Sequence, residues 1–487
     1  MKHFHTWIGA LILLIACKET PAPVLPMPEF IGFETEVTAD AAVITISHKG
    51  DYGIVEAGIY LGAEQQRIKA DALDPGRFTV SVSGLEPSTE YTYKAYISSG
   101  LQEATSQEQT FTTAAAPKIV ATGNGAYTVW TENALIQDIL REGGIDPKDI
   151  EHLKVVGSLA KEDFVYIRSQ MRWLKSVDLL ETDLTTLPKH AFLLSGIESI
   201  ELPDGLEEIG QSAFESCEQL SGTLRFPTSL KVIGTDAFSQ CRKLEGIELP
   251  DGLERIGNYC FLYCESLGGE LVLPASLLEI GERAFEGAAF RGDLVIPGNV
   301  KIVPTGTFMN AGFDGGLTLP EGLTEVGAVA FADSHFQGEL KLPNSLDTIG
   351  DAAFSNVGFA GPLKLPAALK RLGESAFLGN SFSGDLVIPE GIQEIPSYAF
   401  GDGAAIQQYE RVILHKNVQW LKSGAFATSS ETLKEVICYA EEPPVYEEEA
   451  FNAQMIPTIT LFVPADAVQR YREADGWKGF GSIKSIE

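Results

Sequence analysis

A proline followed eleven residues later by a phenylalanine recurs at a nearly constant spacing through the second half of the chain. Successive prolines are 24, 23, 24 and then five times 23 residues apart. The prolines are Pro203, Pro227, Pro250, Pro274, Pro297, Pro320, Pro343, Pro366 and Pro389, and the phenylalanines are Phe214, Phe238, Phe261, Phe285, Phe308, Phe331, Phe354, Phe377 and Phe400. A fixed period in the low twenties is typical of stacked units that bury their apolar sides against one another. The repeat therefore predicts a solenoid.

The structure of one unit can be predicted from residues 222–238. Residues 222–226 alternate between polar and apolar, which predicts a short strand, and Pro227 ends it because proline donates no ladder hydrogen bond. Residues 230–234 predict a second extended piece, and Ala237 and Phe238 begin a short helical or 3₁₀ turn with the phenylalanine inward. Phe192, Phe426 and Phe451 extend the pattern to about twelve units, which at about 4.8 Å per unit would span roughly 55–60 Å.

Both ends of the array differ from the repeat, as solenoid ends must. Residues 114–180 contain two amphipathic helical patterns, 132–141 and 162–174, around a strand-like piece at 153–156, and we interpret them as an N-terminal cap. The repeats then occupy residues 181–460, with an irregular stretch at 401–444. Residues 461–487 predict a C-terminal cap, with a short helix followed by apolar residues every third position.

Cysteines occupy one equivalent position in three consecutive units. Cys217, Cys241 and Cys264 each stand three residues after the phenylalanine, where later units have alanine, serine or valine. This pattern predicts a buried column of small side chains and not a catalytic thiol. A disulfide between neighbouring units stays open as an alternative if the compartment is oxidising.

Residues 29–113 predict a small all-β domain before the cap. Segments 43–46, 78–82 and 91–96 have strand patterns separated by turn residues, and about seven short strands fit this length. The stretch around Leu85 and Tyr91 resembles the E–F corner of fibronectin type III domains. That resemblance implies an immunoglobulin-like sandwich in which Leu85 fills the core and the Tyr91 hydroxyl bonds to the backbone.

The first 28 residues have the composition of an export signal and a tether. Residues 1–16 combine an early lysine with a short apolar run, which is too short to span a bilayer. The run ends in Leu14-Ile15-Ala16-Cys17, which resembles the lipobox of bacterial lipoproteins and implies that Cys17 carries a lipid. The alternative is an ordinary signal peptide with a chance cysteine. Residues 17–28 are proline-rich and predict an extended tether.

The recurring residue pairs Leu-Pro, Ile-Gly and Ala-Phe closely resemble those of the BspA-like leucine-rich repeats of bacterial surface proteins. The resemblance runs from about residue 180 to the end of the chain, and with the lipobox it points to a surface lipoprotein of the Bacteroidota type. It implies a leucine-rich-repeat solenoid of parallel strands with short helical or 3₁₀ turns. It also implies export, a lipid anchor in the bacterial outer membrane, exposure at the cell surface and attachment to host proteins or other cells.

Charge and motif content exclude several functional classes. The formal net charge of −31 opposes nucleic-acid binding. It also opposes electrostatic docking to anionic lipid, so the membrane is expected to be contacted only through the lipid anchor. The seven histidines show no ligand spacing and no nucleophile elbow or phosphate loop is present, so we expect no metal, no cofactor and no catalytic residue. Arg291-Gly292-Asp293 spells the integrin-binding tripeptide, but it falls in a turn that every unit uses, and we interpret it as structural.

The outward positions of the repeat are the candidate binding surface. On the first strand they include Val272, Val295, Thr318, Lys341, Lys364 and Val387, and on the second piece they include Thr348, Arg371 and Trp420. Exposed apolar residues on a sheet face indicate a covered or adhesive surface, and an exposed tryptophan is a common anchor for a sugar ring or a protein. The alternative for Trp420 is packing beneath the irregular 401–444 loop.

These observations predict a non-enzymatic, adhesin-like binding protein. The expected partner is an extracellular or host protein recognised through the repeat surface. The alternative is a glycan, captured by an accessory lipoprotein for polysaccharide uptake, which clustered exposed aromatic residues would favour. A hydrolase with a pair of carboxylates is the third and least favoured hypothesis.

Overall fold

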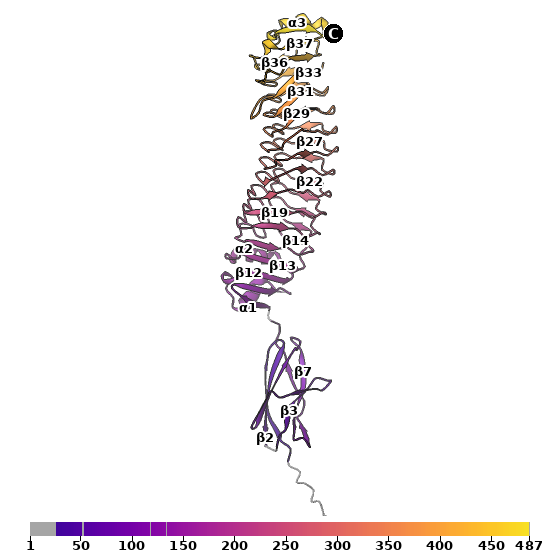
Figure 1. Cartoon of the computed structure of the whole chain (residues 1–487). Coiled ribbons are helices and arrows are strands. Elements are labelled where there is room, and N and C mark those ends of the chain that lie inside the picture. Colours follow the sequence, from indigo (N-terminus) through magenta and orange to yellow (C-terminus); the bar gives the residue numbers. More distant parts are fainter. Residues whose placement is uncertain (1–25, 51–52, 117, 133, 487) are drawn as a thin grey trace, which may run out of the picture. The chain divides into compact units, whose positions relative to one another are not determined.

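The computed structural model describes residues 26–50, 53–116, 118–132 and 134–486, so Cys17 and residues 1–16 lie outside the described part. The chain divides into two compact units, residues 1–117 and 118–487. In the described ranges no helix is both long and apolar enough to cross a membrane. Figure 1 shows the strands of both units.

The first unit is all β and consists of two antiparallel sheets around one core. The first sheet has the order β1 (Glu29–Val37), β2 (Ala41–Lys49), β6 (Arg77–Ser83), β5 (Ala72–Asp74), and the second the order β4 (Gln66–Lys69), β3 (Glu56–Leu61), β7 (Glu90–Ser98), β8 (Glu103–Thr105), with β9 (Gln109–Thr112) also on β7. Alternate residues of β2 and β6 face the core, as period-two patterning requires. Leu85 is buried, and the Glu86 N–H donates to the Tyr91 hydroxyl at 2.8 Å. The predicted small all-β domain is confirmed.

The second unit is a solenoid of about fifteen turns, so the predicted repeat solenoid is confirmed. Parallel strands stack in two columns (Figure 1). The first column contains β11 (Ala126–Trp130), β12 (His152–Gly157), β13 (Ser176–Thr182), β15 (Ser199–Glu201), β17 (Gly222–Arg225), β19 (Leu244–Glu248), β21 (Gly268–Gly269), β23 (Ala289–Phe290), β24 (Leu294–Val295), β26 (Leu317–Thr318), β29 (Ala360–Pro362), β31 (Ser381–Val387), β33 (Gln408–Leu414), β35 (Glu435–Cys438), β37 (Thr460–Val463) and β38 (Ser482–Ser485). β10 (Ile119–Gly123) pairs antiparallel with β11 at its start. The turns outnumber the twelve predicted units because strands β11, β12 and β13, which precede the predicted repeats, continue the first column.

The second column is built from two-residue strands. They are β14 (Thr186–Leu187), β16 (Glu208–Ile209), β18 (Val232–Ile233), β20 (Arg255–Ile256), β22 (Glu279–Ile280), β25 (Ile302–Val303), β27 (Glu325–Val326), β28 (Thr348–Ile349), β30 (Arg371–Leu372), β32 (Glu394–Ile395), β34 (Trp420–Leu421) and β36 (Val445–Tyr446). The column is interrupted between β22 and β25 and again between β30 and β32. Pro304 and Pro396 follow these interruptions where most units have glycine, and a proline has no N–H to donate to the preceding turn.

A glycine after the second strand allows the turns to stack closely. A Cβ built on Gly257 would lie 2.4 Å from the Thr235 nitrogen, and one on Gly281 would lie 2.3 Å from the Asn258 nitrogen. The same contact with backbone recurs at Gly210, Gly234, Gly327, Gly350 and Gly373. In these turns the predicted glycine is therefore a steric requirement, because a Cβ would displace the neighbouring turn, whereas Pro304 and Pro396 stand at the equivalent position where the column is interrupted.

The repeat phenylalanines form a continuous aromatic column inside the solenoid. Their rings stack with nearly parallel planes, as between Phe238 and Phe261, whose centroids are 5.4 Å apart and whose planes differ by 5°. A second buried column, which we did not predict, runs through Phe290, Phe313, Phe336 and Phe359. Its signal is present in the sequence, since each of these residues stands five positions after a repeat phenylalanine.

Short helical segments lie at both ends of the solenoid. At the N-terminal end lie α1 (Ile136–Gly143) and α2 (Lys161–Gln170), which overlap the predicted helical segments 132–141 and 162–174, and η1 (Pro147–Asp149), which was not predicted. The buried Asp163 carboxylate accepts from the Ala160 and Ile136 N–H groups at 2.9 and 2.7 Å, which ties α2 to α1. At the C-terminal end lie η2 (Ile456–Thr458), η3 (Ala465–Ala467), α3 (Val468–Glu473) and η4 (Trp477–Gly479). There the buried Trp477 indole N–H donates to the Pro444 carbonyl at 2.8 Å.

Candidate binding surfaces of the solenoid

The six candidate residues predicted for the first strand lie on successive turns with exposed side chains. Val295, Thr318 and Val387 lie in β24, β26 and β31, whereas Val272, Lys341 and Lys364 lie outside the assigned strands. Val272 is 74% exposed, Val295 is 55% exposed and Val387 is 51% exposed, while Thr318, Lys341 and Lys364 are also exposed. Val295 is in register with Thr318 across a parallel pair of strands. The structure therefore presents this set as a strip in which two valines are followed by a threonine, two lysines and a third valine along the stack.

Arg371 and Trp420 belong to the second column and are separated from that strip. Arg371 donates from Nε and Nη2 to the Thr348 hydroxyl at 3.1 and 3.0 Å. Thr348 was predicted to face outward, and that prediction is wrong because the Arg371 side chain lies over it and leaves it 8% exposed. Trp420 is 37% exposed and is in register with Val445, which is 55% exposed. The two residues form an apolar patch near the C-terminal end of the solenoid.

Two shallow grooves follow the second column. One, of about 680 Å³, is lined by residues around Gly257 and Gly281, and the other, of about 600 Å³, by residues around Gly350 and Gly373. Both end at a proline that interrupts the column, Pro304 or Pro396. The glycines line each groove together with the residues of the neighbouring second-column strands.

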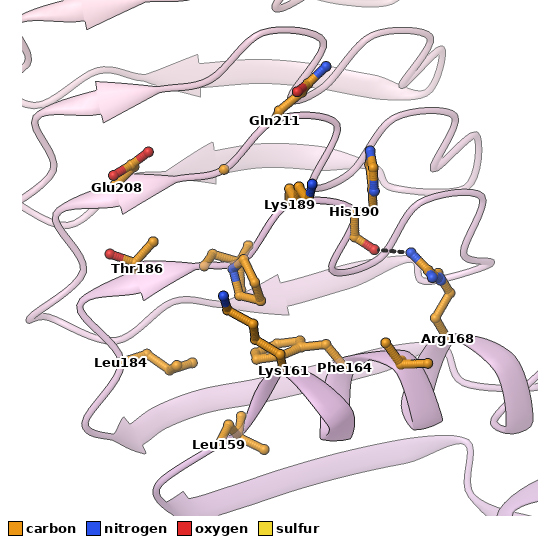
Figure 2. Close-up of a pocket in the computed structure, with 14 residues that line it drawn as sticks. Leu159, Lys161, Phe164, Arg168, Leu184, Thr186, Lys189, His190, Glu208 and Gln211 are labelled. Atoms are coloured by element: carbon orange, nitrogen blue, oxygen red, sulfur yellow. Dashed lines mark hydrogen bonds between the residues drawn. The ribbon is translucent and has the colours of Figure 1, made fainter.

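A third groove, of about 620 Å³, lies between α2 and the first turn of the second column. Figure 2 shows it between the helix that carries Lys161 and Arg168 and the turn that carries Lys189 and His190. Its floor is apolar and includes Leu159, Val165, Leu184 and Leu187. The Nη1 group of Arg168 donates a hydrogen bond to the His190 carbonyl, which holds the guanidinium at the side of the groove. We did not predict this site, because the fold alone brings its two sides together.

Both charged side chains of the Arg-Gly-Asp tripeptide bond to the next turn of the solenoid. Arg291 forms an ion pair of 3.3 Å with Asp314 of the next turn, whose carboxylate also accepts from the Gly292 N–H at 2.7 Å. The Asp293 carboxylate accepts from the Gly316 N–H at 2.7 Å. The Gly292 N–H, followed by the Arg291 guanidinium, lowers the pKa of Asp314. Both charged side chains of the tripeptide thus contribute to stacking, in agreement with its structural interpretation.

The cysteines of the array are buried thiols. Cys217, Cys241, Cys260, Cys264 and Cys438 are all free, so the alternative of a disulfide between neighbouring turns is not realised here. Burial raises the pKa of Cys217 and of Cys264 to about 12. A thiol with such a pKa is protonated at neutral pH and is a poor nucleophile. In the ranges that the structure describes, no group of three or more His, Cys, Asp or Glu side chains could hold a metal ion.

Comparison with known proteins agrees with the repeat architecture. The family model described as the BspA type leucine-rich repeat region (6 copies) matches the chain twice, over residues 185–314 and 315–434, which together make up just over half of the chain. No curated protein matches the chain.

Several solved structures are similar to part of the chain. A leucine-rich repeat protein from Bacteroides ovatus is 19% identical over 57% of this chain and 78% of its own, with a TM-score of 0.39. The pneumococcal vaccine antigen PcpA is 19% identical over 69% of this chain and 80% of its own, with a TM-score of 0.36. A Treponema pallidum leucine-rich repeat protein is 24% identical over 41% of this chain and 78% of its own, with a TM-score of 0.24. On the match to its repeats, the chain belongs to the BspA type leucine-rich repeat family.

Proposed function

We propose that this chain is a non-enzymatic, lipid-anchored cell-surface protein that binds an extracellular or host protein through the outer surface of its solenoid. Residues 1–16 direct export, Cys17 carries the lipid, and the all-β unit, a fibronectin type III-like domain, serves as a spacer. The anchor lies in the bacterial outer membrane. The observation that carries the proposal is the strip of exposed valines and lysines at Val272, Val295, Lys341 and Lys364.

The composition of the strip favours a protein over a glycan as partner. Protein interfaces combine a desolvated apolar centre with a polar rim, and exposed valines beside lysines supply both. Glycan sites depend on aromatic faces, and this strip has none among its candidate residues. Membership in a leucine-rich repeat family supports binding in place of catalysis.

A glycan partner is the second candidate, and the exposed patch of Trp420 and Val445 favours it. An indole ring at this exposure offers one stacking surface for a sugar. The patch is small beside the first-column strip, so it supports a single sugar contact more readily than the recognition of a long polysaccharide.

The test is a binding screen of the chain from Lys18 onward at physiological salt, against purified matrix proteins and a glycan array. We expect a saturable protein partner whose affinity falls at least tenfold in the Val272→Glu/Val295→Glu variant, because the new charges would be desolvated at the interface. Leu101→Glu is the matched control, since Leu101 is 96% exposed and lies in the other unit.

The alternatives give different results in the same screen. Binding to glycans alone, abolished by Trp420→Ala, would transfer the assignment to glycan capture. A protein partner that is affected equally by the Leu101→Glu control would refute the proposed strip, and the absence of any partner would refute the proposed function.

A further inference from the structure

The second column of the solenoid begins with an open strand edge. β14 is the first strand of its sheet and has β16 on one side only. The Gly210 N–H donates to the Leu187 carbonyl at 2.9 Å, so Leu187 directs its backbone groups toward β16. Because alternate residues of a strand point their backbone groups to opposite sides, the N–H and C=O of Thr186 face the open edge.

The open edge is short and bounded on both sides. Pro188 follows β14 and has no N–H to donate, and the Asp183 N–H is already bonded to the Gly157 carbonyl at 3.3 Å. Between these limits the Thr185 carbonyl, like that of Leu187, accepts from the following turn, so Thr186 is the β14 residue that can pair with an added segment. An unpaired edge of this kind accepts an extended peptide, whose main chain supplies affinity and whose alternate side chains supply specificity.

The groove beside this edge carries uncompensated positive charge on an acidic protein. Lys161, Arg168 and Lys189 line it against a single acidic residue, Glu208, in a chain with a net charge of −31. Neither Lys161 nor Lys189 forms an ion pair with a carboxylate of the described residues. Figure 2 shows Lys161 extending from the start of α2 toward the first turn.

The position of Lys161 is not explained by helix stability. It is the first residue of α2, and a positive charge near a helix N-terminus is unfavourable because the backbone dipole is positive there. Lysine stems also cover apolar surface while their ammonium groups stay in water. The side of the groove thus combines an apolar floor for alternate side chains with two exposed ammonium groups for the carboxylates of a ligand.

We propose that the groove between α2 and β14 binds an extended acidic segment of a protein partner, which adds as a short strand beside Thr186. This inference rests on the proposed protein-binding function and identifies the kind of segment recognised. An anionic glycan would also be attracted by the lysines. The N–H and C=O of Thr186, which face away from the only strand paired with β14 in the described residues, and the apolar floor match a peptide with alternating apolar and acidic side chains.

The test uses a displayed library of random octapeptides, selected on the chain from Lys18 onward at low salt. We expect enrichment of sequences that alternate apolar with Asp or Glu residues. A selected synthetic peptide, followed by fluorescence polarisation, should bind the Lys161→Glu/Lys189→Glu variant at least tenfold more weakly. The matched control is Lys341→Glu/Lys364→Glu, which reverses two exposed lysines on the first column.

Strand addition is tested separately by chemical change of the probe. Methylation of alternate backbone nitrogens in the selected peptide should abolish binding, because it removes the donors that face β14. Thr186→Pro should also abolish binding, because it removes the β14 backbone N–H that faces the peptide. Circular-dichroism melting checks that each variant remains folded. Unchanged binding of the methylated peptide would overturn the strand arrangement.

The remaining outcomes also decide the proposal. Selection without acidic enrichment, or an equal loss of binding in the Lys341→Glu/Lys364→Glu control, would overturn it. Binding of oligogalacturonate without any selected peptide would replace the peptide by an anionic glycan. If a matrix protein binds through the Val272 strip while the library yields nothing, this inference fails and the proposed function stands. If a peptide binds the groove and no protein binds the strip, the groove stands without the strip.

Discussion

The thiol of Cys241 donates a hydrogen bond of 3.2 Å to the backbone carbonyl of Phe214, in the preceding turn of the solenoid. Cys217 and Cys264 make the same bond to Phe192 and Phe238. Other turns use a different donor at the equivalent position, as Ser334 does with the Phe308 carbonyl at 2.8 Å. The cysteine column is thus one form of a recurring connection between a small polar side chain and the phenylalanine of the turn before it.

Burial of these thiols predicts a loss of stability at alkaline pH. The pKa of Cys217 and of Cys264 is raised to about 12 in the folded chain, from an ordinary value of 9.0. The unfolded chain therefore releases these protons first, so the free energy of unfolding is unaffected below about pH 9 and falls between about pH 9 and 12. Urea titrations at pH 7, 9 and 10.5 measure this fall.

The matched variant for this prediction is Cys217→Ala/Cys264→Ala, since alanine occupies the same position at Ala288 and Ala311. We expect its free energy of unfolding to fall less between pH 9 and 10.5 than that of the unaltered chain. Equal losses in the two proteins would assign the alkaline effect to other groups.

Ser334→Ala should lower the free energy of unfolding by about 1 kcal/mol. The substitution removes one buried hydrogen bond, while the Phe308 carbonyl keeps the bond from the Ala311 N–H at 3.2 Å. Alanine already fills this position in other turns, so little cavity cost is expected. Denaturant unfolding measures the change, and Ser221→Ala, at an exposed serine, is the control. A loss above about 3 kcal/mol would show that packing dominates at Ser334.

Gly257→Ala should destabilise the solenoid by about 1–3 kcal/mol. The added methyl would lie 2.4 Å from the Thr235 nitrogen and 2.5 Å from the Gly234 carbonyl carbon, so the backbone of two turns must separate. Gly298→Ala is the control, because a methyl added there would have no heavy atom within 4 Å. Thermal unfolding of both variants measures the difference, and equal melting temperatures would contradict the steric role of the glycine.

Phe308→Ala should cost about 3–5 kcal/mol, because it opens a cavity in the aromatic column. Phe308 is fully buried and stacks on Phe285 and Phe331, with centroids 5.5 and 5.6 Å apart. Trp173→Ala provides the control, since Trp173 is 66% exposed, and it should change stability little. Comparable losses for the two variants, measured by denaturant unfolding, would indicate that the column is not a continuous core.

The candidate site was predictable only in part. The exposed positions of Val272 and Val295 follow from the strand alternation that the sequence displays, and the burial of Cys241 follows from its place in the repeat. Thr348 illustrates the limit, because the pattern assigns it to the outer surface but cannot show that the Arg371 side chain covers it. Side-chain coverage depends on rotamers and contacts between turns, which a one-dimensional pattern does not contain.

The sequence by itself determined the repeat architecture, since a 23-residue period with one proline and one phenylalanine per unit can bury its apolar residues only by stacking. Only the tertiary structure decided that Lys161 and Lys189, 28 positions apart, line one groove beside Thr186. The reason is physical. In a repeat, the period of the sequence shows which units lie next to one another. Residues 114–180 have no repeat, so the side on which α2 packs depends on contacts between segments that are distant in the chain.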